Sequence, residues 1–244
     1  MMMMKRVLFR RMLEMSVLAV SLAIATQVVS ANSNRHNSAK YLVTITNITR
    51  GQPLTPAVVI THDKDFTLFA EGSQASPELV PIAEDADLEP MIASASQSAD
   101  VHDVQIVGGT GPIVPPGSTR GAGVIKPGES ASVVVEAPGY FNRVSLVGML
   151  ASTNDGFYAL NGLRLHYEGV ATYHSPAWDA GSEVNDEDCA TVPGPPCGNF
   201  FVRNTAGAEG YVHIHPGIHG IKSLVPAASD WRNPVAKITL QRLP

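Results

Sequence analysis

Short apolar runs separated by turn residues recur along this chain and constrain its fold more than any other feature. "YLVTITNI" (41–48) and "VAKITLQRL" (235–243) alternate apolar and polar residues, so that Tyr41, Val43 and Ile45 share one face. The 39 glycines and prolines separate such runs, as turns separate strands. We therefore predict antiparallel strands, each with one face buried. Further runs of this kind lie at 56–61, 66–70, 103–107, 130–137, 143–150, 163–168, 200–203 and 211–215.

One stretch, residues 76–98, departs from the strand pattern. Ser76 suits a helix cap and Pro77 the first helical position, and a second short helix is expected over 88–97. The chain therefore predicts a single mainly β domain over residues 41–243. We expect an antiparallel β-sandwich of about eight strands with a short helical insertion.

The first 31 residues have the features of a secretory signal peptide. Four basic residues and one acid precede an apolar run at 16–26, and small residues occupy the −3 and −1 positions of a cleavage site after Ala31. The run is too short to cross a bilayer, which needs about 20 residues. We expect a secreted or periplasmic protein without a transmembrane segment after signal removal. Residues 32–40 are expected to form a flexible mature N-terminus.

The charge balance argues against nucleic acid as a partner. The whole chain carries a net charge of −5, and without residues 1–31 the net charge is −8. No cluster of lysine and arginine remains that would attract phosphate groups. An acidic exported protein is compatible with a solvated surface or with divalent cations.

Two cysteines, Cys189 and Cys197, flank a loop rich in proline and glycine, "CATVPGPPC". In an exported protein this spacing predicts one local disulfide bond.

Two segments concentrate oxygen ligands, "STNDGFYALNG" (152–162) and "PAWDAGSEVNDED" (176–188). Calcium takes six to eight oxygen ligands, and the loops at one end of a sandwich are able to supply them from separate segments. The alternative interpretation is an acidic loop that is merely solvated.

The order of these segments resembles the spondin domain. Blocks at Thr153–Gly162, Trp178–Asp186 and Pro234–Leu240 are similar to the family's "SPDWFVG", "YDAGTDSG" and closing "P-x-A-x-V-T-L". The family is the N-terminal module of the F-spondin and mindin matrix proteins, and it also occurs alone in exported bacterial proteins. The resemblance covers about residues 41–243, with its specific motifs in the second half.

The resemblance implies an eight-stranded sandwich with one divalent cation, calcium, at one end. Matched by motif, the ligands are Asp155, Asp179 and Glu183, with Asn154 beside them. Glu183 replaces a residue that is often aspartate in animal members, and the tryptophan of "DW" is absent. The implied function is a non-enzymatic adhesion or binding module whose partner is a protein or glycan surface.

A second candidate site is the histidine cluster of "YVHIHPGIHG" (211–220). His213 and His215 share one face of a strand, and His219 follows after a turn. Three histidines suit zinc or copper, and Glu209 is a candidate general base for a metal-dependent hydrolase. The alternative is a polar strand face whose histidines are hydrogen-bonded.

No nucleophile motif supports an enzyme. A GxSxG sequence is absent, and the glycine-rich stretch at 107–121 lacks the lysine of a P-loop. His62, Asp63 and Asp65 are interpreted as an exposed loop. We therefore expect a non-enzymatic protein that binds calcium, with a zinc or copper protein, or a metalloenzyme, as the alternative.

Overall fold

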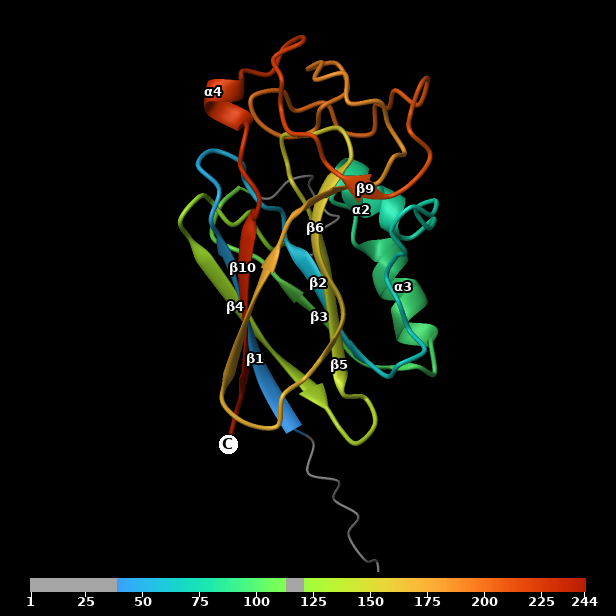
Figure 1. Ribbon diagram of the computed structural model, residues 1–244, viewed down its shortest axis with the longest axis vertical. Coiled ribbons are helices and arrows are strands. Elements are labelled where there is room, and N and C mark those ends of the chain that lie inside the picture. The colour runs from blue at the N-terminus through green and yellow to red at the C-terminus, as the bar shows by residue number, and fades with distance from the viewer. Residues whose placement is uncertain (1–38, 113–120) are drawn as a thin grey trace, which may run out of the picture. The chain divides into compact units, whose positions relative to one another are not determined.

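The alternating runs form two packed antiparallel sheets in the computed structural model, which describes residues 39–112 and 121–244 (Figure 1). The strands are β1 (Ala39–Asn47), β2 (Ala57–His62), β3 (Val101–Val107), β4 (Ser130–Ala137), β5 (Arg143–Met149), β6 (Gly156–Arg164), β7 (Val170–Ser175), β8 (Ala177–Asp179), β9 (His213–Ile214) and β10 (Ala236–Arg242). The helices are α2 (Leu79–Asp85), α3 (Glu89–Gln97) and α4 (Pro226–Ser229).

The four-stranded sheet has the order β4-β1-β10-β7, and the six-stranded sheet has the order β3-β2-β5-β6-β8-β9. The paired strands run antiparallel, so the prediction of an antiparallel β-sandwich is confirmed. The described residues contain ten strands, where about eight were expected.

The first core lies between the two sheets. Tyr41, Val43 and Ile45 of β1 are buried there, as their alternation predicts, and they meet Tyr158 and Leu160 of β6 within one apolar cluster. The outward residues of β1 are less buried. The four-stranded sheet thus has one buried and one wetter face.

A second core lies on the other face of the six-stranded sheet. Helices α2 and α3 cover this face in Figure 1, and Leu79 and Ile82 of α2 pack with Val58 and Phe157 of the sheet. Every residue of β2 is buried, because β2 has a core on both faces. Helix α3 confirms the helix expected over 88–97. Helix α2 begins at Leu79, so the prediction of Pro77 at the first helical position is wrong, although the Leu79 amide does donate to Ser76 Oγ at 3.2 Å.

The predicted signal peptide (1–31) and most of the predicted flexible N-terminus (32–40) lie outside the described residues. Strand β1 starts at Ala39, so the sandwich begins two residues before the expected boundary at residue 41. No helix within 39–112 or 121–244 is long and apolar enough to cross a membrane.

Four sequence predictions of strands are wrong or only partly right. Residues 66–70 and 200–203 are not strands, only His213 and Ile214 of the expected strand at 211–215 are in one, and only residues 163–164 of the expected strand at 163–168 are in one, at the end of β6. Strand β7, the three-residue β8 and most of β6 were not predicted.

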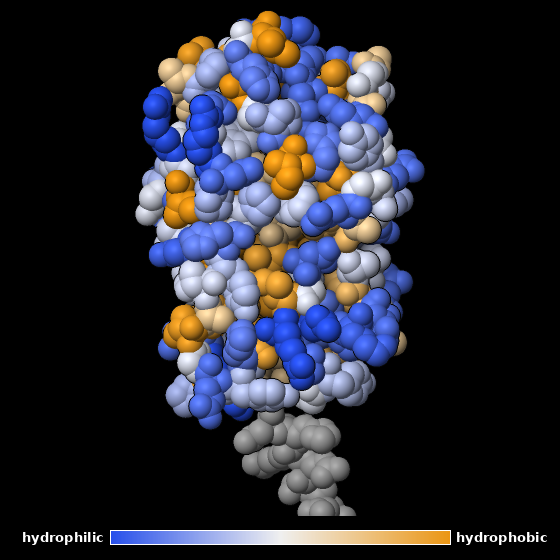
Figure 2. Space-filling view, in the orientation of Figure 1, coloured by the Kyte–Doolittle hydropathy of each residue, from blue (hydrophilic) through white to orange (hydrophobic). Residues whose placement is uncertain are grey.

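One end of the sandwich is built mainly of loops. Between Asp179 and Ala236 the chain forms only β9 and α4, and Figure 1 shows this segment gathered at the end opposite the start of β1. Figure 2 shows a mainly hydrophilic face, with hydrophobic side chains that also reach the surface at this loop-bearing end.

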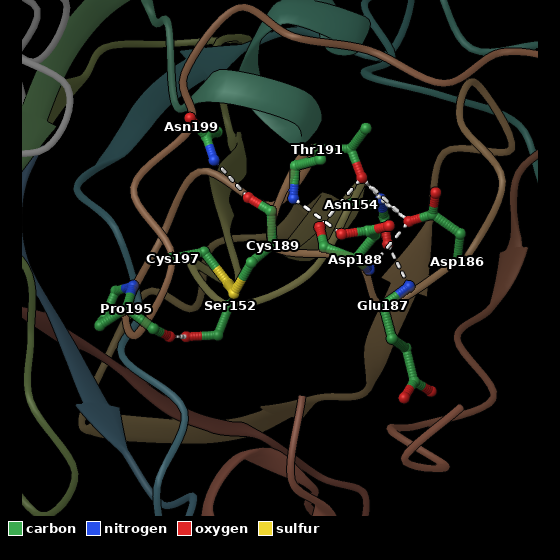
Figure 3. Close-up of a disulfide and its surroundings, with 11 residues drawn as sticks. Ser152, Asn154, Asp186, Glu187, Asp188, Cys189, Thr191, Pro195, Cys197 and Asn199 are labelled. Atoms are coloured by element: carbon green, nitrogen blue, oxygen red, sulfur yellow. Dashed lines mark hydrogen bonds between the residues drawn. A yellow bond between two sulfur atoms is a disulfide. The ribbon is translucent and has the colours of Figure 1, made fainter. Parts of the chain in front are cut away.

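The disulfide bond between Cys189 and Cys197 is present, as predicted, and lies in the loop-bearing end (Figure 3). It belongs to a set of local links that replace regular strand pairing there. Ser152 Oγ donates to the Pro195 carbonyl at 2.5 Å, which ties the β5–β6 turn to the disulfide loop.

His62 is buried, so its interpretation as part of an exposed loop is wrong. Its Nδ1 lies 2.6 Å from the Asp63 carbonyl and its Nε2 lies 2.8 Å from Ser145 Oγ. Because a carbonyl only accepts, Nδ1 carries the hydrogen and Nε2 accepts from the serine hydroxyl. Ser145 Oγ also accepts the Gly162 amide at 2.8 Å, where the β5–β6 register shifts. The Ser145–His62 pair therefore bridges strands inside the protein.

Candidate metal centre

The centre begins with a row of residues across three strands. Gly156 of β6 pairs with Asp179 of β8, and Asp179 pairs with His213 of β9. Paired residues of neighbouring strands project to the same face of a sheet. The next pair on the same face, Tyr158 and Ala177, is buried between the two sheets, so Asp179 and His213 face that side at the loop-bearing end.

A glycine brings the third residue of the centre into place. Gly181 has φ of 65°, and a side chain there would lie 2.4 Å from the Tyr211 carbonyl oxygen. Its own carbonyl accepts the Gly210 amide at 2.8 Å. This close approach places Glu209 beside the end of β8.

Asp179, Glu209 and His213 form a group able to hold a metal ion. One ligand atom from each lies within 4.8 Å of the other two. His213 Nε2 is 3.5 Å from Asp179 Oδ1 and 4.0 Å from Glu209 Oε2. Asp179 is buried, whereas Glu209 is exposed and His213 is partly buried, so the group is reached from the surface.

Neighbouring donors orient the two carboxylates. The Gly181 amide donates to Asp179 Oδ1 at 2.8 Å, and Asn185 Nδ2 donates to Asp179 Oδ2 at 2.6 Å. The same Asn185 amide is 3.5 Å from Glu209 Oε1, so it bridges both acids. Such outer contacts are typical of metal sites, because they fix the ligand oxygens in place.

The His213 ring presents a lone pair to these acids. Its Nδ1 is 3.0 Å from the Ile214 carbonyl, so in the neutral ring Nδ1 carries the hydrogen. Its Nε2 is buried and has no hydrogen-bond partner within the described part of the chain. A buried nitrogen without a partner is costly unless a cation or a proton meets it.

Asp155 and Glu183, two of the predicted calcium ligands, lie close to this group. Asp155 Oδ2 accepts the Ser182 and Glu183 amides at 2.7 and 2.9 Å, and Glu183 Oε1 accepts the Asn204 amide at 2.7 Å. The Asp155 bonds tie the 179–186 segment to the β5–β6 turn, and the Glu183 bond ties it to the loop at Asn204. Asp155 Oδ1 is buried and has no partner among residues 39–112 and 121–244.

The electrostatics of these acids favour a nearby positive charge. Burial raises the pKa of Asp155, and the negative charge of Asp179 raises it further. Burial likewise raises the pKa of Asp179. Burial raises the pKa of Glu183 to about 8, and Asp155 adds to this shift. Each carboxylate is thus destabilised in its charged form.

Asn154 has a structural role. Its Nδ2 donates to Asp186 Oδ1 at 3.0 Å and to Thr191 Oγ1 at 3.1 Å, while its Oδ1 accepts the Glu187 amide at 3.3 Å. Figure 3 shows these hydrogen bonds beside the disulfide bond. They link the β5–β6 turn to the acidic loop. All its polar atoms are engaged, so Asn154 is not directed at the Asp179 group.

The other two predicted histidine ligands lie outside the group of Asp179, Glu209 and His213. His215 Nδ1 accepts the Gly217 amide at 3.0 Å, so its hydrogen is on Nε2, the reverse of His213. Burial lowers the pKa of His215 to about 3. His219 is largely exposed, with Nδ1 3.8 Å from Glu187 Oε1.

Glu187 of the acidic loop accepts backbone hydrogen bonds and takes no part in the candidate metal group. Its carboxylate accepts the amides of His219, Gly220 and Ile221 at 2.6, 2.6 and 3.0 Å. In Figure 3 this carboxylate points away from the disulfide. The carboxylate thus replaces the hydrogen bonds that a regular strand would give the 219–221 backbone.

The group of Asp179, Glu209 and His213 therefore combines one residue from each of the two predicted metal sites. Asp179 comes from the predicted calcium set and His213 from the histidine set. Glu209 was considered only as a general base, and its role as a third donor was missed. The one sequence feature that could have identified Glu209 is its position four residues before His213. That spacing places the two side chains close together only if the loop between them turns back, which the sequence does not show.

A scan of the chain against models of known protein families finds no match, and a search among curated proteins finds no relative. The case for function therefore depends on the geometry of this centre. The spondin resemblance stays a prediction.

Proposed function

We propose that this protein is an exported, spondin-like β-sandwich module that binds one divalent cation at its loop-bearing end. The observation that carries the proposal is the group of Asp179, Glu209 and His213, whose ligand atoms lie within 4.8 Å of one another. The cation fixes the loops that follow β8 and surround β9. In this proposal the protein is not an enzyme, and the fixed loops present a surface to a protein or glycan partner.

The buried acids support a cation at this position. Asp155 and Asp179 raise each other's energy when both are charged, and Asp155 Oδ1 has no hydrogen-bond partner among the described residues. A divalent cation would offset this repulsion and so stabilise the folded protein. The resemblance implies calcium, and Asp155 Oδ1 is an oxygen of the kind that calcium takes.

Export is supported by the disulfide between Cys189 and Cys197, because such bonds persist in oxidising compartments. The disulfide bond also constrains the chain directly after the acidic segment that ends at Asp188. Both features suit a binding module that works outside the cytoplasm.

The test is a melting experiment on protein purified without a histidine tag. The melting temperature should rise when calcium, zinc or manganese is added to chelator-treated protein, and the rise should disappear in Asp179→Asn. Equal melting temperatures with chelator and with every cation would refute the proposal.

A further inference from the structure

We infer that this centre takes a borderline transition metal of the zinc class, through His213 Nε2 and the carboxylates of Asp179 and Glu209, in preference to calcium. The inference depends on the proposed function and specifies the metal class of the same site. It differs from both sets of ligands that the sequence predicts.

The first argument is the chemistry of the donors. Imidazole nitrogen is a ligand for zinc, copper, nickel and iron, whereas calcium takes oxygen ligands almost exclusively. His213 supplies its nitrogen from inside the group, 3.5 Å from Asp179 Oδ1. A calcium ion at this position would face a nitrogen it does not use, whereas zinc uses all three donors.

The second argument is the tautomer of His213. The Ile214 carbonyl holds the hydrogen on Nδ1, which leaves the Nε2 lone pair directed at two acids. Ligand histidines are commonly fixed in this way, by a hydrogen bond from the other ring nitrogen. Three groups that only accept thus face one another, and a cation between them satisfies all three.

The third argument is distance. Two donors bound about 2.0–2.1 Å from one zinc ion, at the tetrahedral angle, lie about 3.4 Å apart. His213 Nε2 and Asp179 Oδ1 are 3.5 Å apart, which is too long for a hydrogen bond and suits this geometry. Glu209 Oε2, at 4.0 Å from Nε2, needs a small side-chain movement, and its partly exposed side chain allows it.

The contrast with His215 supports the choice of ligand. His215 lies two residues further on, just beyond β9, and the Gly217 amide occupies its Nδ1. Its Nε2 is also buried without a partner in the described residues, but it carries a hydrogen and therefore offers no lone pair. Its ring packs edge-on against Trp231, with ring centroids 5.0 Å apart. His215 is therefore a packing residue, and His213 is the metal ligand. Water or a donor atom of a bound ligand takes the coordination positions that the three side chains leave.

The experiment measures zinc, cobalt and calcium binding to tag-free, chelator-treated full-length protein by calorimetry, with cobalt absorption as a second readout. Wild-type protein should bind one zinc ion per chain more tightly than calcium, and cobalt should give the visible absorption of a four- or five-coordinate site. His213→Ala should weaken zinc binding at least 100-fold and remove the cobalt signal. It should change calcium binding by less than threefold.

The matched control is His219→Ala, which removes an exposed histidine of the same segment and should leave zinc affinity unchanged. Circular dichroism and melting of each variant without metal verify that it folds. If wild-type zinc binding survives in His213→Ala, or if calcium binds more tightly than zinc, the inference is wrong while the proposed function stands. If no cation binds the wild-type protein, the proposed function fails as well.

Discussion

Two histidines of the six-stranded sheet show how differently similar side chains are used. His62 ends β2 and is buried with both ring nitrogens hydrogen-bonded, to the Asp63 carbonyl and to Ser145 Oγ. His213 begins β9 and has its Nε2 buried without a hydrogen-bond partner in the described residues, beside two acids. In both rings the hydrogen is on Nδ1, so in both Nε2 is the acceptor.

The difference lies in what meets Nε2. At His62 a serine hydroxyl supplies a hydrogen, so the site is closed and contributes to stability. At His213 the neighbours are carboxylates, which supply none when charged, so we expect a cation to complete the site. Burial alone therefore does not mark a candidate metal ligand; an unmatched acceptor beside carboxylates does.

The largest effect is expected at the closed site. His62→Ala would remove a buried ring and leave Ser145 with one partner fewer, and we expect a loss of about 3 kcal/mol in the free energy of unfolding. The loss should be the same with and without metal, because His62 lies outside the centre. Urea denaturation in chelator and in zinc measures both values. A loss of stability that differs between chelator and zinc would show that His62 is coupled to the metal centre, and the contrast between a closed and an open site would be wrong.

The next effect separates metal binding from folding at the open site. Asp179→Asn keeps the side-chain shape and removes a charge that repels Asp155, but its NH2 group replaces an oxygen that accepts a hydrogen bond, so these effects offset and the stability of metal-free protein should change by no more than about 1 kcal/mol. Wild-type protein should gain about 2.7 kcal/mol from metal at 100 times the dissociation constant, and the variant should not. Denaturation with and without zinc tests this. A variant strongly destabilised without metal would show that Asp179 is structural.

Most of the fold could be predicted from the sequence, because much of it is local pattern. The alternation at 41–48 and 235–243 reports one buried face, and the helical spacing after Ser76 and Pro77 indicated the first helix, which is observed as α2. Strand β8 escaped prediction because it has only three residues, and β9 keeps only two of the five residues expected at 211–215. They exist through pairing with each other and, for β8, with β6, and no local signal encodes that pairing.

The site could be predicted only in fragments for the same reason. Asp179 and His213 were each singled out, but in rival sites, since they become neighbours only when β8 pairs with β9. Glu209 joins them through the turn at Gly181, whose fit against Tyr211 depends on the folded chain. Residue type indicated candidate metal ligands, and tertiary pairing decided which of these candidates lie together.

The pH dependence of stability should differ between the two regions. Burial lowers the pKa of His62, so its contribution is lost as the pH falls below about 6.5, where the unfolded histidine takes up a proton. The pKa of Glu183 is raised to about 8, so stability at that residue is greatest below its unfolded value of about 4.3 and declines as the pH rises through 8.

We therefore expect metal-free protein to lose about 2 kcal/mol between pH 6 and pH 9 from Glu183 and its neighbouring acids, less than full linkage because water screens part of the charge. Saturating zinc, or Glu183→Gln, should flatten this decline. Urea denaturation across the pH range, with chelator and with zinc, provides the measurement. A metal-free protein that grows more stable toward pH 9 would contradict the raised pKa values.

The smallest effect tests the support around the open site. Asn185 donates to Asp179 and lies close to Glu209, without belonging to the group of donors itself. Asn185→Ala should weaken zinc binding about tenfold, or about 1.4 kcal/mol, because both carboxylates lose the amide that orients them. Metal-free protein should lose at most about 1 kcal/mol in the free energy of unfolding, since Asp179 keeps the Gly181 amide and Glu209 is exposed. Calorimetric titration with zinc measures the affinity. An unchanged affinity would mean that the β8–β9 pairing and the Gly181 amide alone orient the ligands, so that backbone geometry builds the open site whereas the Ser145 side chain completes the closed one.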